Sequence, residues 1–158
     1  MEPVTSIRVS LVDVYVLRPG GSGLECLVLR RSPAGRCPGS WEAVHGHIET
    51  GETPADAAQR ELEEETGLRA ERLYNLSRVE TFYQHRSDEV ALVPVFVAFV
   101  GGDTTVRLGP EHDRHEWLPT SAAGERFAWP RERRALEDVL RLLGRGDAGS
   151  VEDVLRVC

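Results

Sequence analysis

The sequence predicts an α/β domain in which helices cover both faces of a central mixed β-sheet, an α/β/α sandwich. Its length of 158 residues is ordinary for a single domain and sufficient to bury a core. Runs of β-branched residues with strand character alternate with two segments of helical character. No linker-like composition break or internal repeat divides the chain, so residues 1–158 are expected to form one domain.

Three segments before the first helix are predicted to be strands. Residues 7–17 and 24–30 are rich in β-branched and aliphatic side chains, and a glycine-rich turn at 19–23 joins them as a hairpin. Residues 32–40 contain two prolines and two glycines and are expected to form a loop. Residues 41–48 then form a short strand that leads into the helix.

The first helix is predicted from local signals within residues 46–68, GHIETGETPADAAQRELEEETGL. Thr53 is a favourable N-cap, a proline follows at the first helical position, and Asp56 stands where a capping box places an acid. Gly67 is a natural stop for the helix, because glycine takes the left-handed turn without a steric penalty. These signals predict a helix over residues 54–66.

Further strands and a second helix are expected after residue 68. The strands are predicted at residues 73–82, 90–100, 106–108 and 115–118. The second of them is the most apolar run of the chain and is expected to be central, with Pro94 marking an edge or a bulge. An alanine-rich turn precedes an amphipathic helix at residues 129–143, and the chain after Gly144 is expected to form a loosely held turn of helix.

The first helix carries an unusual concentration of acidic residues. Helical spacing places Glu61, Glu64 and Glu65 on one face, whereas Ala58 and Leu62 point toward the core. Like charges at these spacings repel, and the negative end of the helix dipole adds to the cost. Taken alone, such a run is typical of a solvated face. A divalent cation over that face would make the arrangement favourable, because carboxylates are ligands of Mg²⁺ and Mn²⁺.

The complete spacing of the segment resembles a known family. It matches at every specified position the GX5EX7REUXEEXGU signature of the Nudix hydrolases, the MutT-like enzymes. The matching residues are Gly46, Glu52, Arg60, Glu61, Glu64, Glu65 and Gly67, with Leu62 and Leu68 as the aliphatic positions. The resemblance implies the Nudix α/β/α sandwich and divalent-metal-dependent hydrolysis of a phosphoanhydride bond.

The resemblance also implies a metal site. Glu61, Glu64 and Glu65 are expected to bind Mg²⁺, with Mn²⁺ as an alternative, and the backbone carbonyl of Gly46 can add a ligand. A further acid outside the signature often joins such a site, and Glu111 is the candidate. The alternative is that Glu111 is an ordinary turn residue after a Gly-Pro pair, and the sequence leaves both interpretations open.

The remaining signature residues are expected to support the catalytic carboxylates. Glu52 and Arg60 resemble bracing residues, and the positive charge of Arg60 would keep its neighbours ionised. Gly67 is expected to be structural. The general base is either Glu61 or Glu64, because members of the family differ in which residue serves.

Substrate choice is predicted from weaker resemblance. The stretches EHDRHEWLP, WEAVHGHIETGE and VPVFVAFV resemble bacterial dATP or dihydroneopterin triphosphate pyrophosphohydrolases. This implies cleavage of a nucleoside or pterin triphosphate to a monophosphate and pyrophosphate. The alternatives are a dinucleoside polyphosphate or nucleotide-sugar hydrolase, and a nucleotide-sensing Nudix module without catalysis. A sensor would be expected to lack a signature glutamate, and none is missing.

Five residues outside the signature are candidates for substrate binding. Arg30 and Arg31, at a strand end, can grip phosphates, although a solvated surface role is the alternative for at least one of them. Trp41, Tyr83 and Trp129 can stack on a base, although most aromatic residues are simply packed.

Composition limits the partners and the location. The chain has 19 basic and 26 acidic residues and a net charge of −7, which argues against nucleic-acid binding and favours a small nucleotide-like substrate held through metal. No apolar run is long enough to span a membrane, and the N-terminal residues lack a signal-peptide pattern. Three scattered cysteines favour a reducing, cytoplasmic location. A homodimer with residues 90–100 near its interface is compatible with the sequence.

Overall fold

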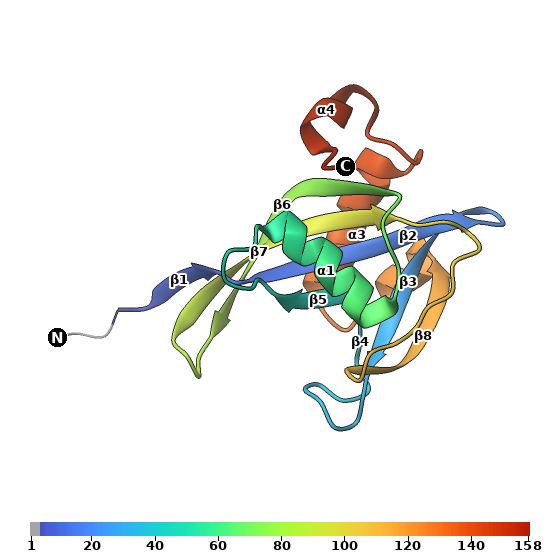
Figure 1. Cartoon of the computed structure of the whole chain (residues 1–158). Coiled ribbons are helices and arrows are strands. Elements are labelled where there is room, and N and C mark those ends of the chain that lie inside the picture. Colours follow the sequence, from blue (N-terminus) through green and yellow to red (C-terminus); the bar gives the residue numbers. More distant parts are fainter. Residues whose placement is uncertain (1–3) are drawn as a thin grey trace.

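A mixed β-sheet with helices on both faces forms the structure, a computed structural model that describes residues 4–158 (Figure 1). This confirms the predicted sandwich. The strands of the described chain are β1 (Ser6–Val9), β2 (Leu11–Gly20), β3 (Gly23–Arg31), β4 (Trp41–Glu42), β5 (Val44–His47), β6 (Arg72–Gln84), β7 (Glu89–Phe99) and β8 (His112–Pro119). The helices are α1 (Pro54–Thr66), α2 (Thr120–Arg126), α3 (Pro130–Leu143) and α4 (Glu152–Leu155), with a 3₁₀ turn at Gly149–Val151.

Strand β7 is central, as predicted. It pairs in parallel with β1 and β2 along one edge and antiparallel with β6 along the other, while β2 also pairs with β3 and β5. Pro94 lies opposite a register shift in β6 between Asn75 and Val79, which is the bulge that the proline predicted. Because both edges of β7 are paired, the strand offers no open edge for a dimer contact at residues 90–100.

Two predicted strands are each divided in two. The segment 7–17 breaks at Ser10, whose carbonyl accepts a hydrogen bond from the Ile48 N–H at 2.9 Å. The segment 41–48 breaks at Ala43, whose N–H donates to the side chain of Glu132 at 2.7 Å. At Ala43 a partner distant in sequence takes the N–H, so strand propensity alone does not reveal that break.

The predicted strand at 106–108 is wrong, because this segment packs along the end of α1 instead of joining the sheet. The Arg107 N–H donates to the Thr66 carbonyl at 2.8 Å, and the Gly109 N–H donates to the Glu65 carbonyl at 3.3 Å. These bonds satisfy carbonyls that the end of a helix leaves unpaired. The segment thereby fixes the C-terminal end of the acidic helix.

The C-terminal part of the chain contains more helix than predicted. The alanine-rich stretch forms α2 rather than a turn, with Ala123 buried against the sheet. Helix α3 begins one residue later than expected, at Pro130. The segment after Gly144 is firmly attached, because the Tyr74 hydroxyl donates to Glu152 at 2.8 Å and residue 157 bonds to strand β6.

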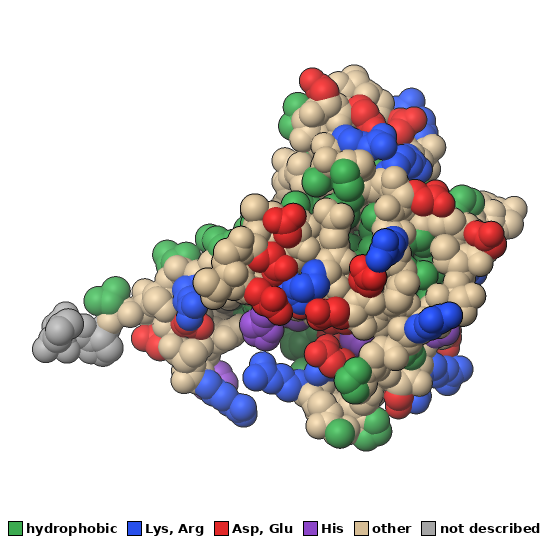
Figure 2. Space-filling view, in the orientation of Figure 1, with side chains coloured by type: hydrophobic (Ala, Val, Ile, Leu, Met, Phe, Trp, Pro, Cys, Tyr) green, Lys and Arg blue, Asp and Glu red, His purple; other side chains and the backbone are tan. Residues whose placement is uncertain are grey.

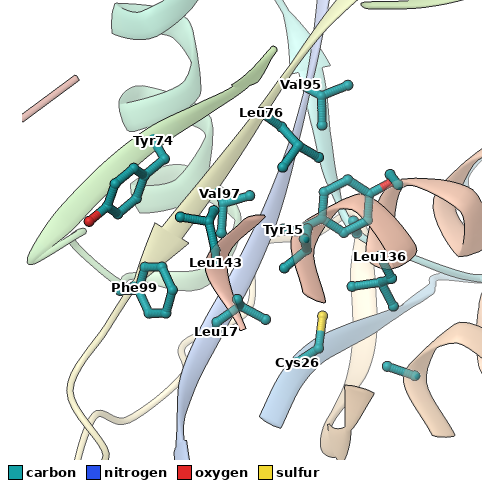
Figure 3. Close-up of a cluster of buried hydrophobic side chains, with 14 of the residues drawn as sticks. Tyr15, Leu17, Cys26, Tyr74, Leu76, Val95, Val97, Phe99, Leu136 and Leu143 are labelled. Carbon is teal, nitrogen blue, oxygen red and sulfur yellow. The ribbon is translucent and has the colours of Figure 1, made fainter. Parts of the chain in front are cut away.

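Two hydrophobic cores lie on opposite faces of the sheet. Alternate residues of a strand point to opposite faces, so Tyr15 and Leu17 of β2 face α2 and α3, whereas Val14 and Val16 face α1. Figure 3 shows the first core, the one between the sheet and helices α2 and α3, in which side chains of α3 pack against the sheet. Helix α1 is thus held by its own apolar side and leaves its acidic side outside the core.

The ends of α1 follow the sequence rules that predicted them. The Asp56 N–H donates to the Thr53 hydroxyl at 3.2 Å, and the Thr53 N–H donates to the Asp56 carboxylate at 3.3 Å, which is a capping box. Gly67 ends the helix with φ of 71° and donates its N–H to the Glu63 carbonyl. No helix within residues 4–158 is long and apolar enough to cross a membrane.

Gly67→Ala is expected to lower the free energy of unfolding by about 1 kcal/mol or more, because alanine is strained at positive φ. The added Cβ would also lie 3.2 Å from the Cβ of Arg107. Gly21→Ala is the control, because Gly21 has open space around it and no positive φ. Urea unfolding measures both, and equal stability of the two variants would contradict the assignment.

Candidate active site

Helix α1 presents a group of carboxylates that we call the carboxylate patch: Glu61, Glu64 and Glu65, with Glu111 from the loop before β8. Figure 2 shows acidic side chains gathered on the face of the molecule where α1 lies. The three helical members differ in exposure, since the Glu64 side chain is 58% exposed, that of Glu61 is 12% exposed, and Glu65 is buried. The acidic face of α1 therefore carries one exposed carboxylate and two that are largely or fully buried.

Arg60 forms hydrogen bonds with two members of the patch and with Glu52. Its Nε and Nη2 donate to the two carboxylate oxygens of Glu52, both at 2.8 Å. Its Nη1 donates to Glu61 at 2.9 Å and to Glu64 at 3.1 Å, and Nη2 also reaches the carbonyl of His47 at 2.7 Å. The hydrogen bonds from Arg60 hold the pKa of Glu52 at about 2. Arg60 and Glu52 thus form a bidentate pair, and Arg60 donates three further bonds.

Gly46 allows β5 to approach α1 closely. A Cβ at this position would overlap the carboxylate of Glu61. Its φ is not in the left-handed region, so the glycine serves close approach rather than a turn. The signature therefore requires glycine here because the Glu61 carboxylate lies against the strand backbone.

Glu65 is the most perturbed member of the patch. Within the described chain its Oε1 is buried without a hydrogen-bond partner, and its Oε2 accepts only a long bond of 3.4 Å from the His45 N–H. Burial, together with the charges of Glu111 and Glu61, raises the pKa of Glu65 to about 10. Burial likewise raises the pKa of Glu61, against the opposing effect of Arg60. A cation at the patch would relieve both effects.

Glu111 lies in the loop before β8, and its role as a metal ligand stays a prediction. Its charge raises the pKa of Glu61 and of Glu65, which places it near both. Its backbone carbonyl accepts the Ser32 N–H at 2.9 Å, and its carboxylate lies 3.6 Å from Arg31 Nη1.

The patch fits a hard divalent cation by the chemistry of its donors. It supplies only oxygen ligands, one of them buried and unpartnered, and such oxygens are the ligands of Mg²⁺ and Mn²⁺. Among residues 4–158 no three acidic, His or Cys side chains converge as a preformed ligand shell. Arg60 Nη1 instead bonds the carboxylates of both Glu61 and Glu64.

The two predicted phosphate-binding arginines lie on opposite faces of β3. Arg31 is on the α1 side, where it lies near Glu111 and donates to Glu42 at 3.3 Å. Arg30 points the other way and forms a bidentate pair with Asp113 at 2.8 and 3.1 Å. Strand alternation separates them, so the structure brings only Arg31 to the patch.

The three predicted stacking residues have different surroundings. Trp41 is half-buried against the first core, with the Arg126 guanidinium 4.7 Å from its ring centre. Trp129 is 41% exposed before α3, and Tyr83 is 57% exposed on β6 with its hydroxyl bonded to Asp88. The neighbour of Tyr83, Phe82, points to the other face of the sheet, where the Arg131 guanidinium lies 5.9 Å from its ring centre.

The sequence did not single out a polar cluster on the far face of the sheet. Asp13, His45, Arg131 and Glu132 are hydrogen-bonded to one another or to the strand backbone there. The only signals were Asp13 inside a β-branched run and an acid among the buried positions of α3. Neither signal specifies a partner.

Comparison with known proteins identifies the family. The model of the NUDIX domain matches residues 8–139. The chain belongs to the Nudix family. Nudix hydrolases generally use divalent metal ions, in agreement with the oxygen donors of the patch.

Two curated relatives carry different names. A protein of Myxococcus xanthus named octanoyltransferase is 40% identical over 118 residues, which are 73% of this chain and 32% of that protein. The Rattus norvegicus bis(5′-nucleosyl)-tetraphosphatase (asymmetrical) is 32% identical over 80 residues, 49% of this chain and 54% of that protein. The chain thus spans about a third to about a half of the length of these relatives.

Two solved structures share the Nudix fold. The C. elegans Ap4A hydrolase in a binary complex has a TM-score of 0.72 and 23% identity, covering 86% of this chain and 98% of that chain. The E. coli dihydroneopterin triphosphate pyrophosphohydrolase has a TM-score of 0.63 and 24% identity, covering 80% and 92%. At these identities the likeness establishes the fold.

Glu132→Gln is expected to change how stability depends on pH. Burial raises the pKa of Glu132 to about 8 from an ordinary value of 4.5. Between these values the folded protein binds the extra proton, so this group makes the free energy of unfolding fall as pH rises, by up to about 1.4 kcal/mol per pH unit. Urea unfolding from pH 4.5 to 8 should show a flatter profile for the variant, and parallel profiles would contradict the assignment.

Proposed function

We propose that this Nudix protein hydrolyses a phosphoanhydride bond in a nucleoside or pterin triphosphate and releases a monophosphate and pyrophosphate. The observation that carries the proposal is the complete carboxylate patch, in which Arg60 braces Glu61 and Glu64 while Glu65 keeps an unpartnered buried oxygen. Such a patch suits phosphate chemistry, which depends on positioning and on neutralising charge. We further propose that residues 1–158 act as one domain.

The metal in this proposal is Mg²⁺, with Mn²⁺ as an alternative. Glu61, Glu64, Glu65 and Glu111 would hold it, with the carbonyl of Gly46. When bound, the ion supplies positive charge that offsets the charge on the phosphates. This contribution matters because the chain itself has a net charge of −7 and would repel a polyphosphate.

The residues of the chain would divide the remaining work. Glu64 is the helical carboxylate most open to solvent, and we assign it the proton of the attacking water. Glu61, the alternative base, is largely buried and held by Arg60. Arg31 lies beside the patch and would contact phosphate oxygens. The exposed ring of Trp129 is available for stacking on a base, as is that of Tyr83.

The second candidate is cleavage of a dinucleoside polyphosphate or a nucleotide sugar by the same patch. The 32% identity to the rat tetraphosphatase and the fold likeness to the nematode Ap4A hydrolase favour it. The fold likeness to the dihydroneopterin triphosphate enzyme favours the first candidate. A purely sensing module is the least supported, because every signature glutamate is present.

Product analysis distinguishes these candidates. The purified protein with Mg²⁺ would be incubated with dNTPs, NTPs, dihydroneopterin triphosphate, dinucleoside polyphosphates and nucleotide sugars, and the phosphate products separated by ion-exchange chromatography. Pyrophosphate and a monophosphate from a triphosphate are the expected result. Cleavage of bridged dinucleotides or sugars alone would establish the second candidate. Binding of nucleotide without turnover would establish the sensor.

Glu64→Gln is expected to lower kcat by orders of magnitude while the protein remains folded, because glutamine keeps an oxygen for the bond from Arg60 and removes one charge from a repelling cluster. The matched control is Glu63→Gln, since Glu63 lies off the patch and pairs with Arg69 at 3.0 Å. EDTA should abolish turnover and Mg²⁺ should restore it. Steady-state kinetics and circular dichroism measure these effects, and an unfolded Glu64→Gln protein would indicate a structural role instead.

A homodimer and a cytoplasmic location complete the proposal. Apolar side chains of the sheet end are exposed, notably Ile7 at 69% and Val9 at 52%, and these support self-association. The three cysteines form no disulfide, which supports a reducing compartment. Sedimentation velocity reports the oligomeric state, and a monomer at all concentrations would exclude the dimer.

A further inference from the structure

A buried ionic cluster lies on the face of the sheet opposite α1. Asp13 of β2 is 1% exposed. Its Oδ1 lies 2.6 Å from Nδ1 of His45 in β5, and its Oδ2 accepts a bond of 3.0 Å from Nε of Arg131 in α3. The cluster therefore joins two neighbouring strands to the first turn of a helix.

The partners of Asp13 offset the cost of burying its charge. Burial alone would raise the pKa of Asp13, but the hydrogen bond from His45 and the charges of His45 and Arg131 outweigh it and lower the pKa. The carboxylate form of Asp13 is thus favoured, and it accepts a hydrogen bond from Nδ1 of His45 in the tautomer that carries the proton there. A buried carboxylate is costly without partners, so the three side chains hold one another in a fixed arrangement.

Strand register connects this cluster to the carboxylate patch. Asp13 is the Cα partner of His45, and Val12 is the Cα partner of Gly46. Fixing the His45 ring against Asp13 fixes the next residue, Gly46, whose backbone lies against the Glu61 carboxylate on the other face. The backbone N–H of His45 also faces Glu65, at 3.4 Å from Oε2.

Helix α3 attaches to the same stretch of strand at a second point. Ala43 lies between β4 and β5 without a ladder partner of its own, and its N–H donates to Glu132 Oε2 at 2.7 Å. Glu132 therefore contacts Ala43 directly, whereas Arg131 reaches His45 through Asp13. Sheet pairing holds residues 44 and 45 against β2, and α3 adds a contact at Ala43, the position that the ladders leave unpaired.

We propose that Asp13, His45 and Arg131 are positioning residues for the carboxylate patch: through them, α3 fixes strand β5 so that Gly46 and the His45 N–H meet Glu61 and Glu65. This inference rests on the proposed function of the patch. The cluster acts from the opposite face of the sheet and touches neither the metal nor the phosphates. Its effect is on the geometry of the ligands, in the way that residues supporting metal ligands commonly act.

Substitutions of His45 test the proposal, with Mn²⁺ binding to the substrate-free protein measured by electron paramagnetic resonance. His45→Ala removes the bond to Asp13 and is expected to weaken Mn²⁺ affinity about 10- to 100-fold. His45→Asn places an amide N–H near the position of Nδ1 and should restore most of the affinity. In turnover, kcat should fall and recover in parallel while KM changes little. His45→Gln, which instead mimics Nε2, should not rescue.

If His45→Ala fails to fold, Arg131→Gln tests the positioning role by removing the contact that α3 makes with Asp13. It is expected to weaken Mn²⁺ binding and lower kcat, whereas Arg134→Gln, on the exposed side of the same helix, should do neither. Equal Mn²⁺ affinity in the wild type, His45→Ala and Arg131→Gln would overturn the positioning role. The same conclusion would follow if His45→Gln restored the affinity and His45→Asn did not. A wild-type protein that binds no Mn²⁺ would overturn the proposed function itself.

Discussion

The pairing of Arg60 with the carboxylates around it is the interaction on which the site depends. Helix α1 brings Glu61, Glu64 and Glu65 together near its C-terminal end, where both mutual repulsion and the helix dipole oppose negative charge. Arg60 offsets part of this by bonding Glu61 and Glu64, and Glu52 fixes the guanidinium in place. Glu65 receives no bond from this arginine, and burial together with the neighbouring carboxylates raises its pKa.

The two faces of the sheet contribute differently to the site. The α1 face supplies the carboxylates, and its core anchors the helix through Ala58 and Leu62. The α3 face supplies a buried ionic cluster that holds the strand next to those carboxylates. Because alternate residues of one strand point to opposite faces, a two-residue stretch such as His45 and Gly46 can transmit position across the sheet.

Whether a feature could be predicted from the sequence depends on how far apart along the chain its interacting residues lie. The helix at 54–66 was predicted to the residue, because its cap, its proline and its terminal glycine are local signals. The break at Ala43 depends on a partner more than thirty residues away, as does the loop at 106–108 that packs on α1. The Nudix signature located the carboxylates, but the cluster around Asp13 required three-dimensional contacts that no spacing encodes.

Thermal unfolding reports whether a divalent cation completes the carboxylate patch. An ion that binds only the folded protein stabilises it by about 2.7 kcal/mol at a concentration 100 times its dissociation constant. Calorimetry with increasing Mg²⁺, against NaCl of equal ionic strength, should show a Tm that rises with Mg²⁺ alone. A Tm that responds equally to both salts would mean that the carboxylates are merely screened and that the patch holds no specific ion.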